Sequence, residues 1–303
     1  MMEEMARPKV FVVILNWNLK DDTIACVESV LSSSYTPQGV VVVDNGSSDG
    51  SASAIANRFG ERVVLLANQA NVGFAAGVNV GIRYALAQGA DWVLLLNNDT
   101  IIAPDMIERL IAAADRYPDI GILAPVIFYH DRPSQIWQLG AQHRRWLPIP
   151  FRVSAKALRS EKDLLPVDYV TGCGMLIRRD VFLTIGLFDP SYFMYYEDAD
   201  FCRRAVKAGF SIGCVPAARM WHKVSRSTRG DVSRKYYLKT RYRVQFYRHH
   251  YSLAAWIYLT MSVLGTMLVT ALRGEGKAAW ACARGFYHGW RFSGVNQLTK
   301  GGE

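Results

Sequence analysis

Amide and carboxylate side chains follow two apolar runs of this sequence, at the points where buried strands would end. The run "WVLLL" (92–96) leads directly into "NNDT" (97–100), and four valines lead into an acid and an amide in "VVVVDN" (40–45). Carboxylates accept hydrogen bonds from a base or a ribose hydroxyl, and together with phosphates they are preferred ligands of Mg²⁺ and Mn²⁺. We therefore expect a nucleotide site in which Asp44 contacts the base or the ribose and Asp99 binds a divalent cation.

The elements that would carry these side chains alternate between strand and helix through the first 130 residues. Continuous apolar runs such as "VFVVILN" (10–16) indicate strands buried on both faces of a parallel sheet. Further strands are expected at 40–44, 63–66 and 92–96, and helices at 21–34, 51–59, 74–88 and after Pro104. The alternation predicts an α/β fold with a mostly parallel central sheet. Because ligands bind at the carboxyl ends of such strands, Asn16 and the two polar tips should meet at one edge.

The middle of the chain has weaker patterns. Segment 131–166 contains four prolines and a charged stretch, and it is predicted to be a surface excursion. Beyond it, "VDYVTGCGMLIRR" (167–179) is expected to be extended, "YYEDADFCRRAVKAG" (195–209) to be helical and "FSIGCVP" (210–216) to be a strand. Regular structure is therefore expected to resume at residue 167.

Three glycines at 73, 77 and 81 raise the alternative of a dinucleotide-binding site. Their spacing is GxxxGxxxG instead of GxGxxG, and they follow the third expected strand instead of the first. We expect these glycines to allow close packing of a helix and the approach of backbone amides to a ligand.

The C-terminal region combines a basic stretch with an uncharged apolar segment. From Lys223 to Arg248 there are nine lysines or arginines and one acid, Asp231, and residues 252–272 carry no charge. The apolar segment has about the 20 residues that a helix needs to cross a bilayer. A basic collar beside it predicts attraction to anionic lipids, with the helix either spanning the membrane or lying in its interface. A buried helix beside a solvated basic face is the alternative, and nucleic acid is a less favoured partner for the net charge of +9.

The remaining composition is typical of a cytoplasmic protein. Five scattered cysteines without CxxC spacing favour a reducing compartment over a disulfide framework or a zinc site. The N-terminal "MMEEMARPKV" is acidic and has neither the basic region nor the cleavage site of a secretory signal.

Seven motifs occur in the order and approximate spacing of a known family. They are "VVILNWN", "VVVVDNGSSDGS", "NVGFAAGVNVGI", "LLLNNDT", "TGCGMLIRRDVF", "GLFDPSYFMYYEDADFCRRAVKAGF" and "WHKVSRS". Over residues 9–228 the sequence resembles the family 2 glycosyltransferases, especially the bacterial branch that includes rhamnosyltransferases of cell-surface polysaccharide synthesis. The resemblance implies a GT-A fold that takes a nucleotide-diphosphate sugar and inverts its anomeric carbon.

The resemblance also implies roles for individual residues. Asn16 would lie beside the nucleotide, and Asp44 would hold a uracil or thymine base or its ribose. The full donor-binding set is Asn16, Asp44, Asn45, Asn71, Gly73, Asn97, Asn98, Asp99 and Gly172. "NND" (97–99) takes the position of the family's Asp-x-Asp motif, with an amide in place of the first carboxylate. This departure leaves Asp99 and His222 as the expected ligands of Mg²⁺ or Mn²⁺.

The acidic run "EDAD" (197–200) fits the displacement that the resemblance implies. An acceptor hydroxyl must lose its proton as it attacks, so a carboxylate within hydrogen-bond reach serves as general base. Asp198 aligns with the family's base, Glu197 is the neighbouring carboxylate, and Asp200 should face away from Asp198 on a helix. An acidic first turn that complements the helix dipole is the alternative.

Aromatic side chains are candidates for stacking on acceptor sugars. Tyr195 and Tyr196 directly precede the acidic run, and Trp221 belongs to the "WHKVSRS" motif. Trp137 and Trp146 could stack in the same way, but Trp221 is the tryptophan that we expect at the site.

Together with these patterns, the resemblance implies an inverting, metal-dependent hexosyltransferase at the cytoplasmic face of the bacterial inner membrane. Its GT-A domain would span residues 1–228, with a donor half at 9–130 and an acceptor half at 167–228, and residues 229–303 would associate with the membrane. The candidate donor is dTDP-rhamnose, and the acceptor would be a polyprenyl-linked saccharide or a polysaccharide. Two alternatives are a catalytically degenerate GT-A membrane scaffold and a sugar-phosphate nucleotidylyltransferase, although "NWNLKDD" is not the glycine-rich basic loop that the latter needs.

Overall fold

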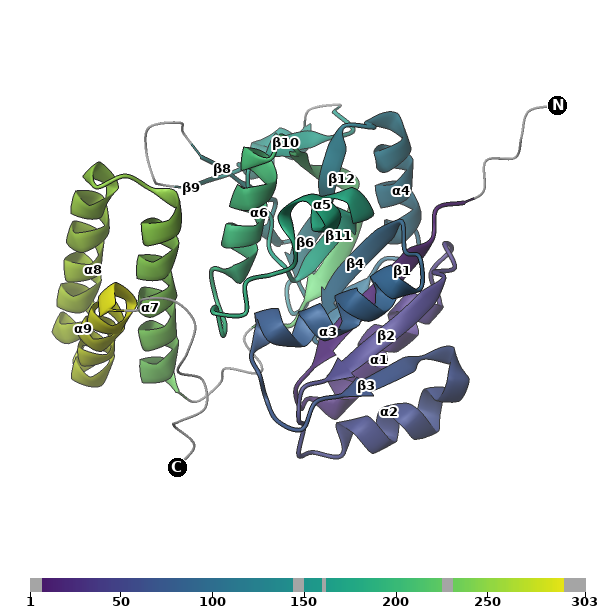
Figure 1. Cartoon of the computed structure of the whole chain (residues 1–303), viewed down its shortest axis with the longest axis horizontal. Helices are drawn as coiled ribbons and strands as arrows, with labels where there is room; N and C mark the ends of the chain where they lie inside the picture. Colours follow the sequence, from purple (N-terminus) through teal and green to yellow (C-terminus); the bar gives the residue numbers. More distant parts are fainter. Residues whose placement is uncertain (1–6, 144–149, 160–161, 225–230, 292–303) are drawn as a thin grey trace.

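The computed structural model of the chain describes residues 7–143, 150–159, 162–224 and 231–291 (Figure 1). Its strands are β1 (Val10–Asn16), β2 (Gly39–Asp44), β3 (Val64–Ala67), β4 (Trp92–Asn97), β5 (Thr100–Ile102), β6 (Ile120–Tyr129), β7 (Ile136–Gln138), β8 (Ala141–His143), β9 (Pro150–Arg152), β10 (Leu165–Val167), β11 (Gly174–Arg178) and β12 (Ser211–His222). Its α-helices are α1 (Lys20–Leu31), α2 (Ser51–Phe59), α3 (Phe74–Ala87), α4 (Met106–Arg116), α5 (Arg179–Ile185), α6 (Glu197–Lys207), α7 (Val232–His250), α8 (Ala254–Leu272) and α9 (Gly276–Arg291). Short 3-10 helices lie at Gly60–Arg62 and Ala155–Arg159.

One ten-stranded sheet forms the centre of the molecule. Its order is β10-β12-β6-β11-β4-β1-β2-β3, with β5 beside β12 and β7 beside β6. Strands β3, β2, β1 and β4 are parallel neighbours, whereas β11 inserts antiparallel between β4 and β6. The predicted α/β class is confirmed, and the sheet is parallel in its first half and mixed beyond β4. The carboxyl ends of β1, β2 and β4 therefore lie at one edge of the sheet, where the polar residues that follow these strands were predicted to meet.

Helices cover both faces of the sheet (Figure 1). Successive residues of β1 point to opposite faces, as in any strand. Val12 belongs to the buried cluster formed with α1, α2 and α4, and Val13 belongs to the cluster formed with α3, α5 and α6. The continuous apolar runs of the sequence are thus explained by burial on two sides.

The glycines of α3 allow this helix to lie close to the sheet. A Cβ atom at Gly77 would lie 2.6 Å from the Leu15 side chain, and one at Gly81 would lie 2.4 Å from Val13. Both distances are too short for any larger residue without movement of β1 or α3. The prediction that these glycines serve close helix packing is confirmed.

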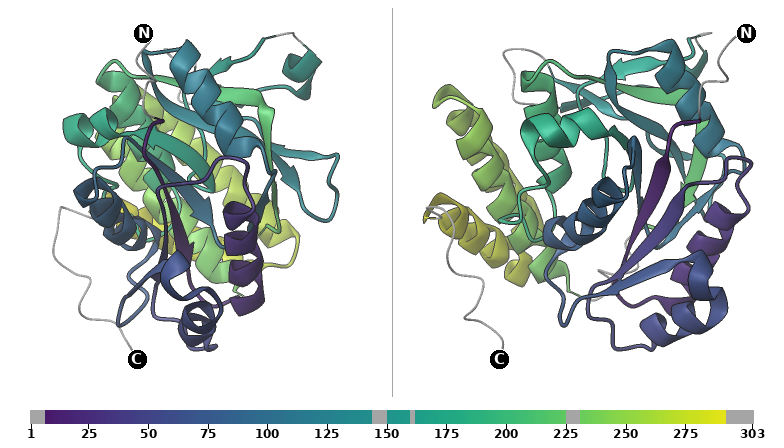
Figure 2. Two further views of the ribbon diagram at one scale, coloured as in Figure 1. Left: turned by 90° about the vertical axis from the view of Figure 1, so that its right-hand side faces the viewer. Right: turned by 45° about the vertical axis from the view of Figure 1, so that its right-hand side comes forward.

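The helices α7, α8 and α9 form a layer on one side of the α/β body (Figures 1 and 2). Helix α9 packs against both α7 and α8. A Cβ atom at Gly285 or Gly289 of α9 would lie 2.5 Å from a backbone oxygen of α7, so the two helices approach as closely as their backbones allow. The predicted domain boundary at 228–229 and Trp146 lie outside the described residues.

The layer is joined to the body through α6 and the loop before it. Tyr192 of that loop and Tyr242 of α7 are fully buried, and their ring centroids are 5.7 Å apart. Nε2 of His250, at the end of α7, lies 2.7 Å from Oδ1 of Asp200 in α6. The position of α7 is therefore fixed relative to the acidic first turn of α6.

Candidate functional site

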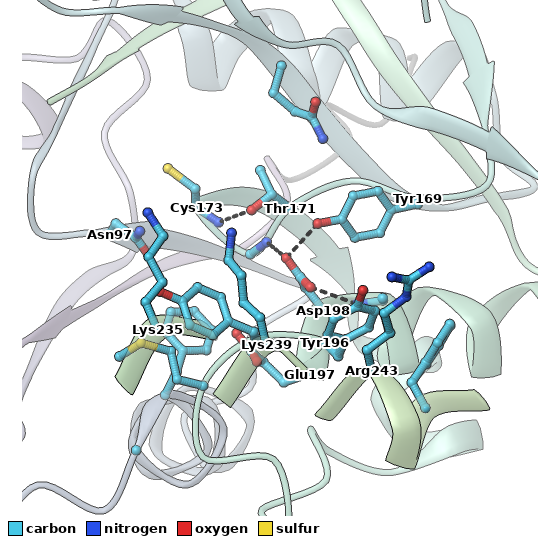
Figure 3. Close-up of a pocket in the computed structure, with 18 of the residues that line it drawn as sticks. Asn97, Tyr169, Thr171, Cys173, Tyr196, Glu197, Asp198, Lys235, Lys239 and Arg243 are labelled. Atoms are coloured by element: carbon cyan, nitrogen blue, oxygen red, sulfur yellow. Dashed lines mark hydrogen bonds between the residues drawn. The ribbon is translucent and has the colours of Figure 1, made fainter. Parts of the chain in front are cut away.

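A cavity of about 950 Å³ lies at the carboxyl ends of the central strands and extends to α7 and α8 (Figure 3). Most residues that the sequence predicted for the site line it together: Asn45, Asn71, Gly73, Asn97, Asn98, Asp99, Gly172, Tyr195, Tyr196, Glu197, Asp198 and His222. They come from the ends of β2 and β4, from the loops before α3 and β11, from the first turn of α6 and from the end of β12. Segments more than 100 residues apart in the sequence thus surround one space.

Asp99 and His222, the predicted cation ligands, lie side by side. Antiparallel pairing of β5 with β12 sets Thr100 opposite His222 and brings the preceding turn to the end of β12. Nε2 of His222 lies 3.0 Å from Oδ1 of Asp99, and both side chains are more than nine-tenths buried. Nδ1 of His222 is buried without a hydrogen-bond partner.

This pair has the chemistry of an incomplete site for a divalent cation. A carboxylate oxygen and an imidazole nitrogen are both ligands of divalent cations, and these two would be close enough to hold one cation together. Within the described residues there is no group of three or more His, Cys, Asp or Glu side chains placed to hold a metal. The two residues fit a divalent cation that would take its remaining ligands from outside these side chains.

The turn before α6 is strained, and it directs the acidic pair into the cavity. Tyr195 (φ 74°) and Tyr196 (φ 71°) are consecutive residues in the left-handed backbone region, which residues other than glycine rarely adopt. Helix α6 begins at the next residue, Glu197. Backbone strain of this kind is found mainly at functional sites, where the surroundings hold it in place.

Asp198 is held by three hydrogen bonds. Its Oδ2 accepts from the Tyr169 hydroxyl at 2.9 Å and from the Gly172 N–H at 3.2 Å, and its Oδ1 accepts from the Ala199 N–H at 2.8 Å (Figure 3). Burial raises the pKa of Asp198 above its ordinary value, and these hydrogen bonds to the carboxylate limit the rise. Burial therefore makes Asp198 more basic than an exposed aspartate, and the hydrogen bonds fix the orientation of its carboxylate.

Glu197 differs from Asp198 although the two are neighbours. It is 6 % exposed, and its Oε2 is buried without a hydrogen-bond partner. Burial and the adjacent charge of Asp198 raise the pKa of Glu197 well above its ordinary value. Hydrogen bonds to a carboxylate favour its ionised form, and Asp198 accepts several whereas Oε2 of Glu197 has none. Asp198 is therefore the carboxyl of the pair that is more readily ionised and able to accept a proton.

Asp200 faces away from Asp198, as predicted. Its carboxylate lies 2.8 Å from Nε of Arg204 and 2.7 Å from Nε2 of His250. Burial alone would raise the pKa of Asp200, but the hydrogen bonds and charges of His250 and Arg204 lower it below its ordinary value. The acidic turn thus divides into carboxyls that face the cavity and one that ties α6 to α7.

The loop before α3 contacts the loop before α6 through a glycine. Gly73 has φ +88°, and a Cβ atom there would lie 2.5 Å from the carbonyl oxygen of Phe193. That oxygen accepts a hydrogen bond of 2.6 Å from the Phe74 N–H. Asn45 supports the same loop by donating to Asn71 Oδ1 at 3.0 Å.

Asn16 and Asp44 do not line the cavity, although both were expected at the nucleotide. Asn16 is fully buried: its Nδ2 donates to Asp44 Oδ1 at 2.6 Å, and its Oδ1 accepts from Asn98 at 3.0 Å and from Thr23 at 2.6 Å. Asp44 is 4 % exposed and also accepts from the Ser47 N–H. The structure gives Asn16 a positioning role, because it joins the ends of β1, β2 and β4. Contact of Asp44 with a base or ribose stays a prediction.

The expectation that Trp221 lies at the acceptor is wrong for this structure. Neighbouring residues of a strand point to opposite faces, so Trp221 turns away when His222 faces the cavity. Its indole N–H donates to the carbonyl oxygen of Pro133 at 3.3 Å. Trp137 lines the cavity instead of Trp221, and its ring centroid lies 4.7 Å from that of His222.

Several residues of the cavity escaped prediction as site residues, and four of them carry polar groups that matter for the proposals below. Tyr169 belongs to a segment that was expected only to be extended. Lys235, Lys239 and Arg243 belong to the basic stretch that was assigned to lipid contact as a whole, yet their spacing of four residues places them on one face of α7. That spacing was the available signal.

Comparison with known proteins identifies the family. The sequence model described as glycosyltransferase-like family 2 matches residues 8–244. The chain belongs to this family. An N-acetylglucosaminyl-diphospho-decaprenol L-rhamnosyltransferase of Mycobacterium tuberculosis is 35 % identical over 216 residues, which cover 64 % of this chain and 69 % of that protein. Membership in family 2 confirms glycosyl transfer as the class of reaction and removes the nucleotidylyltransferase alternative.

Solved structures agree on the fold. A mannosyltransferase from Pyrobaculum calidifontis, in complex with GDP-Man and Mn²⁺, has a TM-score of 0.61 at 16 % identity and covers 95 % of this chain and 88 % of that one. GalNAc-T7 with UDP, GalNAc and Mn²⁺ has a TM-score of 0.61 at 17 % identity and covers 81 % of this chain. The chain spans about half, 48 %, of the length of GalNAc-T7. The predicted GT-A fold is confirmed for this family member.

Proposed function

We propose that the protein transfers a sugar from a nucleoside diphosphate to a hydroxyl of a lipid-linked saccharide, with inversion at the anomeric carbon. The observation that carries this proposal is the meeting of Asp99, His222 and Asp198 in one cavity. A rhamnosyl group from dTDP is the first donor to test, because the sequence resembles the rhamnosyltransferase branch and the Mycobacterium tuberculosis relative is named as an L-rhamnosyltransferase of a diphospho-decaprenol saccharide.

The donor is placed at the strand ends. Asn71, Gly73 and Asn97 line the cavity there and offer amide and backbone groups to the nucleotide and its phosphates. Asp99 and His222 would hold Mg²⁺ or Mn²⁺ together with those phosphates. When bound, the cation stabilises the negative charge that develops on the departing diphosphate.

Asp198 acts as the general base in this proposal. Its carboxylate is oriented by Tyr169 and the Gly172 N–H, and it takes the proton of the acceptor hydroxyl as that oxygen attacks. Glu197 holds its own proton more tightly and remains available to bind an acceptor hydroxyl. A base and a departing group on opposite sides of one carbon produce inversion in a single displacement, and no covalent intermediate is required.

The acceptor is expected at a membrane, which α8 contacts with one side. Among the described residues, α8 is the helix that is long and apolar enough to cross a bilayer, with a mean hydropathy of 1.7. Leucine, isoleucine and methionine side chains form an exposed stripe along it: Leu253, Ile257, Met261, Leu264, Leu268 and Leu272. An apolar stripe of this size on a surface helix marks an interaction with lipid or with another protein.

We infer that α8 lies in the interface and does not span the bilayer. Its opposite side is buried against α7 and α9, which carry Arg243, Arg248, Lys277 and Arg284. A spanning orientation would draw these charges into the hydrocarbon, at a cost of several kcal/mol each. Lying flat, α8 places its stripe among the acyl chains and leaves the basic residues near anionic head groups. The membrane face would be the cytoplasmic one, where nucleotide sugars are available.

A donor panel tests the proposal. Purified protein would be incubated with dTDP-rhamnose, UDP-sugars and GDP-sugars, each with a diphosphate-linked saccharide acceptor, with Mn²⁺ or with EDTA. We expect transfer from one donor, dependence on the cation and loss of transfer in Asp198→Asn. The anomeric configuration of the product, read by NMR, checks inversion. Absence of nucleotide binding and of turnover with every donor would instead support a degenerate scaffold.

A further inference from the structure

Three basic side chains of α7 form a row on the wall of the cavity. Lys235, Lys239 and Arg243 are four residues apart, so they lie on one face of the helix, roughly 6 Å from one another along its axis. Figure 3 shows all three reaching into the cavity from α7, beside Glu197 and Asp198. We call them the α7 basic row.

The row has no acidic partner in the described part of the chain. None of its members forms an ion pair with an aspartate or glutamate there. Nζ of Lys239 lies 5.1 Å from the ring centroid of Tyr195, and Nη1 of Arg243 donates to Ser262 of α8 at 2.9 Å. Aromatic and hydroxyl contacts thus hold Lys239 and Arg243 in place without neutralising their charge.

Gathering these cations costs free energy in the ligand-free protein. Burial, together with the charges of Lys235 and Arg152, lowers the pKa of Lys239 below its ordinary value. Like charges that line one cavity repel each other, and a bound anion relieves that repulsion. A diphosphate suits the row because it offers several anionic oxygens to successive ammonium and guanidinium groups.

We propose that the α7 basic row binds the diphosphate of the lipid-linked acceptor. The inference rests on the proposed function and adds to it the residues that hold the acceptor. Two diphosphates meet in such a reaction, and we assign them to different parts of the cavity. The donor diphosphate belongs with Asp99 and His222 at the strand ends. The row ends at Arg243, which is bonded to α8, the helix whose outer side carries the apolar stripe. A lipid tail that leaves the row at this end would have to pass α8 to reach the apolar stripe on its outer side.

Direct binding measurements separate the two diphosphates. Full-length protein would be titrated with farnesyl diphosphate, with farnesol as the uncharged control, and separately with dTDP in the presence of Mn²⁺. In the double variant Lys239→Gln/Arg243→Gln we expect farnesyl diphosphate to bind at least about tenfold more weakly, because two charge-assisted contacts are lost. Binding of dTDP and of farnesol should not change.

Matched variants keep the test decisive. Arg234→Gln removes a charge from the same helix at an exposed position outside the cavity wall, and it should leave farnesyl diphosphate binding unchanged. Lys239→Arg/Arg243→Lys keeps the charge and should retain most of the binding. The proposal is overturned if Arg234→Gln weakens binding as much as the double variant does. It is also overturned if the double variant weakens dTDP binding and leaves farnesyl diphosphate unaffected, since the row would then hold the donor.

Failure of the proposed function has a different signature. If wild-type protein binds no nucleotide and turns over no donor, the transferase proposal fails, whereas farnesyl diphosphate binding still decides the role of the row. If the donor is transferred to a neutral octyl glycoside as efficiently as to a diphosphate-linked saccharide, and both KM values are unchanged in the double variant, the row proposal fails and the transferase stands.

Discussion

The Tyr169 hydroxyl donates a hydrogen bond of 2.9 Å to Oδ2 of Asp198. This bond favours the charged carboxylate and opposes the rise in pKa that burial causes. In Tyr169→Phe the pKa of Asp198 should therefore rise further, and more of the base should be protonated at a given pH. We expect the acidic limb of kcat/KM to move to higher pH, with activity partly recovered in alkaline buffer. Tyr117→Phe, at an exposed position after α4, serves as control. An unmoved limb would contradict the assignment of Asp198 as base.

Asp198 and Glu197 should respond differently to the loss of charge. Asp198→Asn removes the base and should lower kcat by about 10²- to 10⁴-fold, with nucleotide binding unchanged. Glu197→Gln replaces a carboxyl whose pKa is already raised by burial and by Asp198, so its effect on kcat should be smaller. Single-turnover kinetics and nucleotide titrations measure both. A larger loss in Glu197→Gln than in Asp198→Asn would exchange the two roles.

Replacement of Asn97 by aspartate should raise the affinity of the protein for the divalent cation. Its side chain lines the cavity two residues before Asp99, in the position where the family's motif has its first carboxylate. Asn97→Asp adds a charged oxygen ligand, and we expect the Mn²⁺ concentration for half-maximal activity to fall roughly tenfold. His222→Ala should raise it. Calorimetric titration of Mn²⁺ in the presence of dTDP provides the measurement, and identical Mn²⁺ affinities in all three proteins would refute the predicted ligand set.

Asn98 should contribute strongly to stability. Its Nδ2 donates to Asn16 Oδ1 and to Thr23 Oγ1 within a buried network. Asn98→Ala removes both of these buried hydrogen bonds and leaves a small cavity among polar groups, so the free energy of unfolding should fall by about 1–3 kcal/mol. Asn57→Ala, at an exposed position of α2, should change it by less than about 0.5 kcal/mol. Urea denaturation of both variants gives the comparison, and equal values would show that the network is dispensable.

Membrane binding should depend on the apolar stripe of α8. Ile257 is 73 % exposed and Met261 is 65 % exposed. The variant Ile257→Asp/Met261→Asp places two charges where acyl chains are expected, so co-sedimentation with anionic vesicles should fall sharply while dTDP binding is retained. Wild-type protein should also bind neutral vesicles more weakly than anionic ones. Undiminished sedimentation of the variant would exclude the stripe as the membrane contact.

The parts of the fold that could be predicted are those with a local signal. Uninterrupted apolar runs identified the parallel strands, and α2 has the bounds that its pattern indicated. The short run "GMLIR" of β11 has no feature that reveals its direction, so the antiparallel insertion was not foreseen. The contact between Asp99 and His222 depends on the pairing of β5 with β12 across more than 100 residues, and only the family resemblance pointed to it.

Two residues at the site, Trp221 and Asn16, lie elsewhere than predicted, and the sequence contains the physical cause only for Trp221. Trp221 and His222 are consecutive in a strand, so they cannot face the same cavity, and the alternation rule would have excluded Trp221. Asn16 has a short amide side chain at the end of a central strand, where the neighbouring strand ends compete for its hydrogen bonds. Its burial follows from the sheet order, which the sequence does not specify.

Helix α8 separates the cavity from the outer surface of the protein. Tyr258 and Ser262 line the cavity, while their chain neighbours Ile257 and Met261 are exposed on the outer side. The helix is about 10 Å across, so under the proposed function a polyprenyl tail would travel about this distance between the cavity and the membrane. The saccharide end can then enter the enzyme while the tail stays dissolved in the bilayer. Successive acceptors would be exchanged by lateral diffusion, without desorption of either the lipid or the protein.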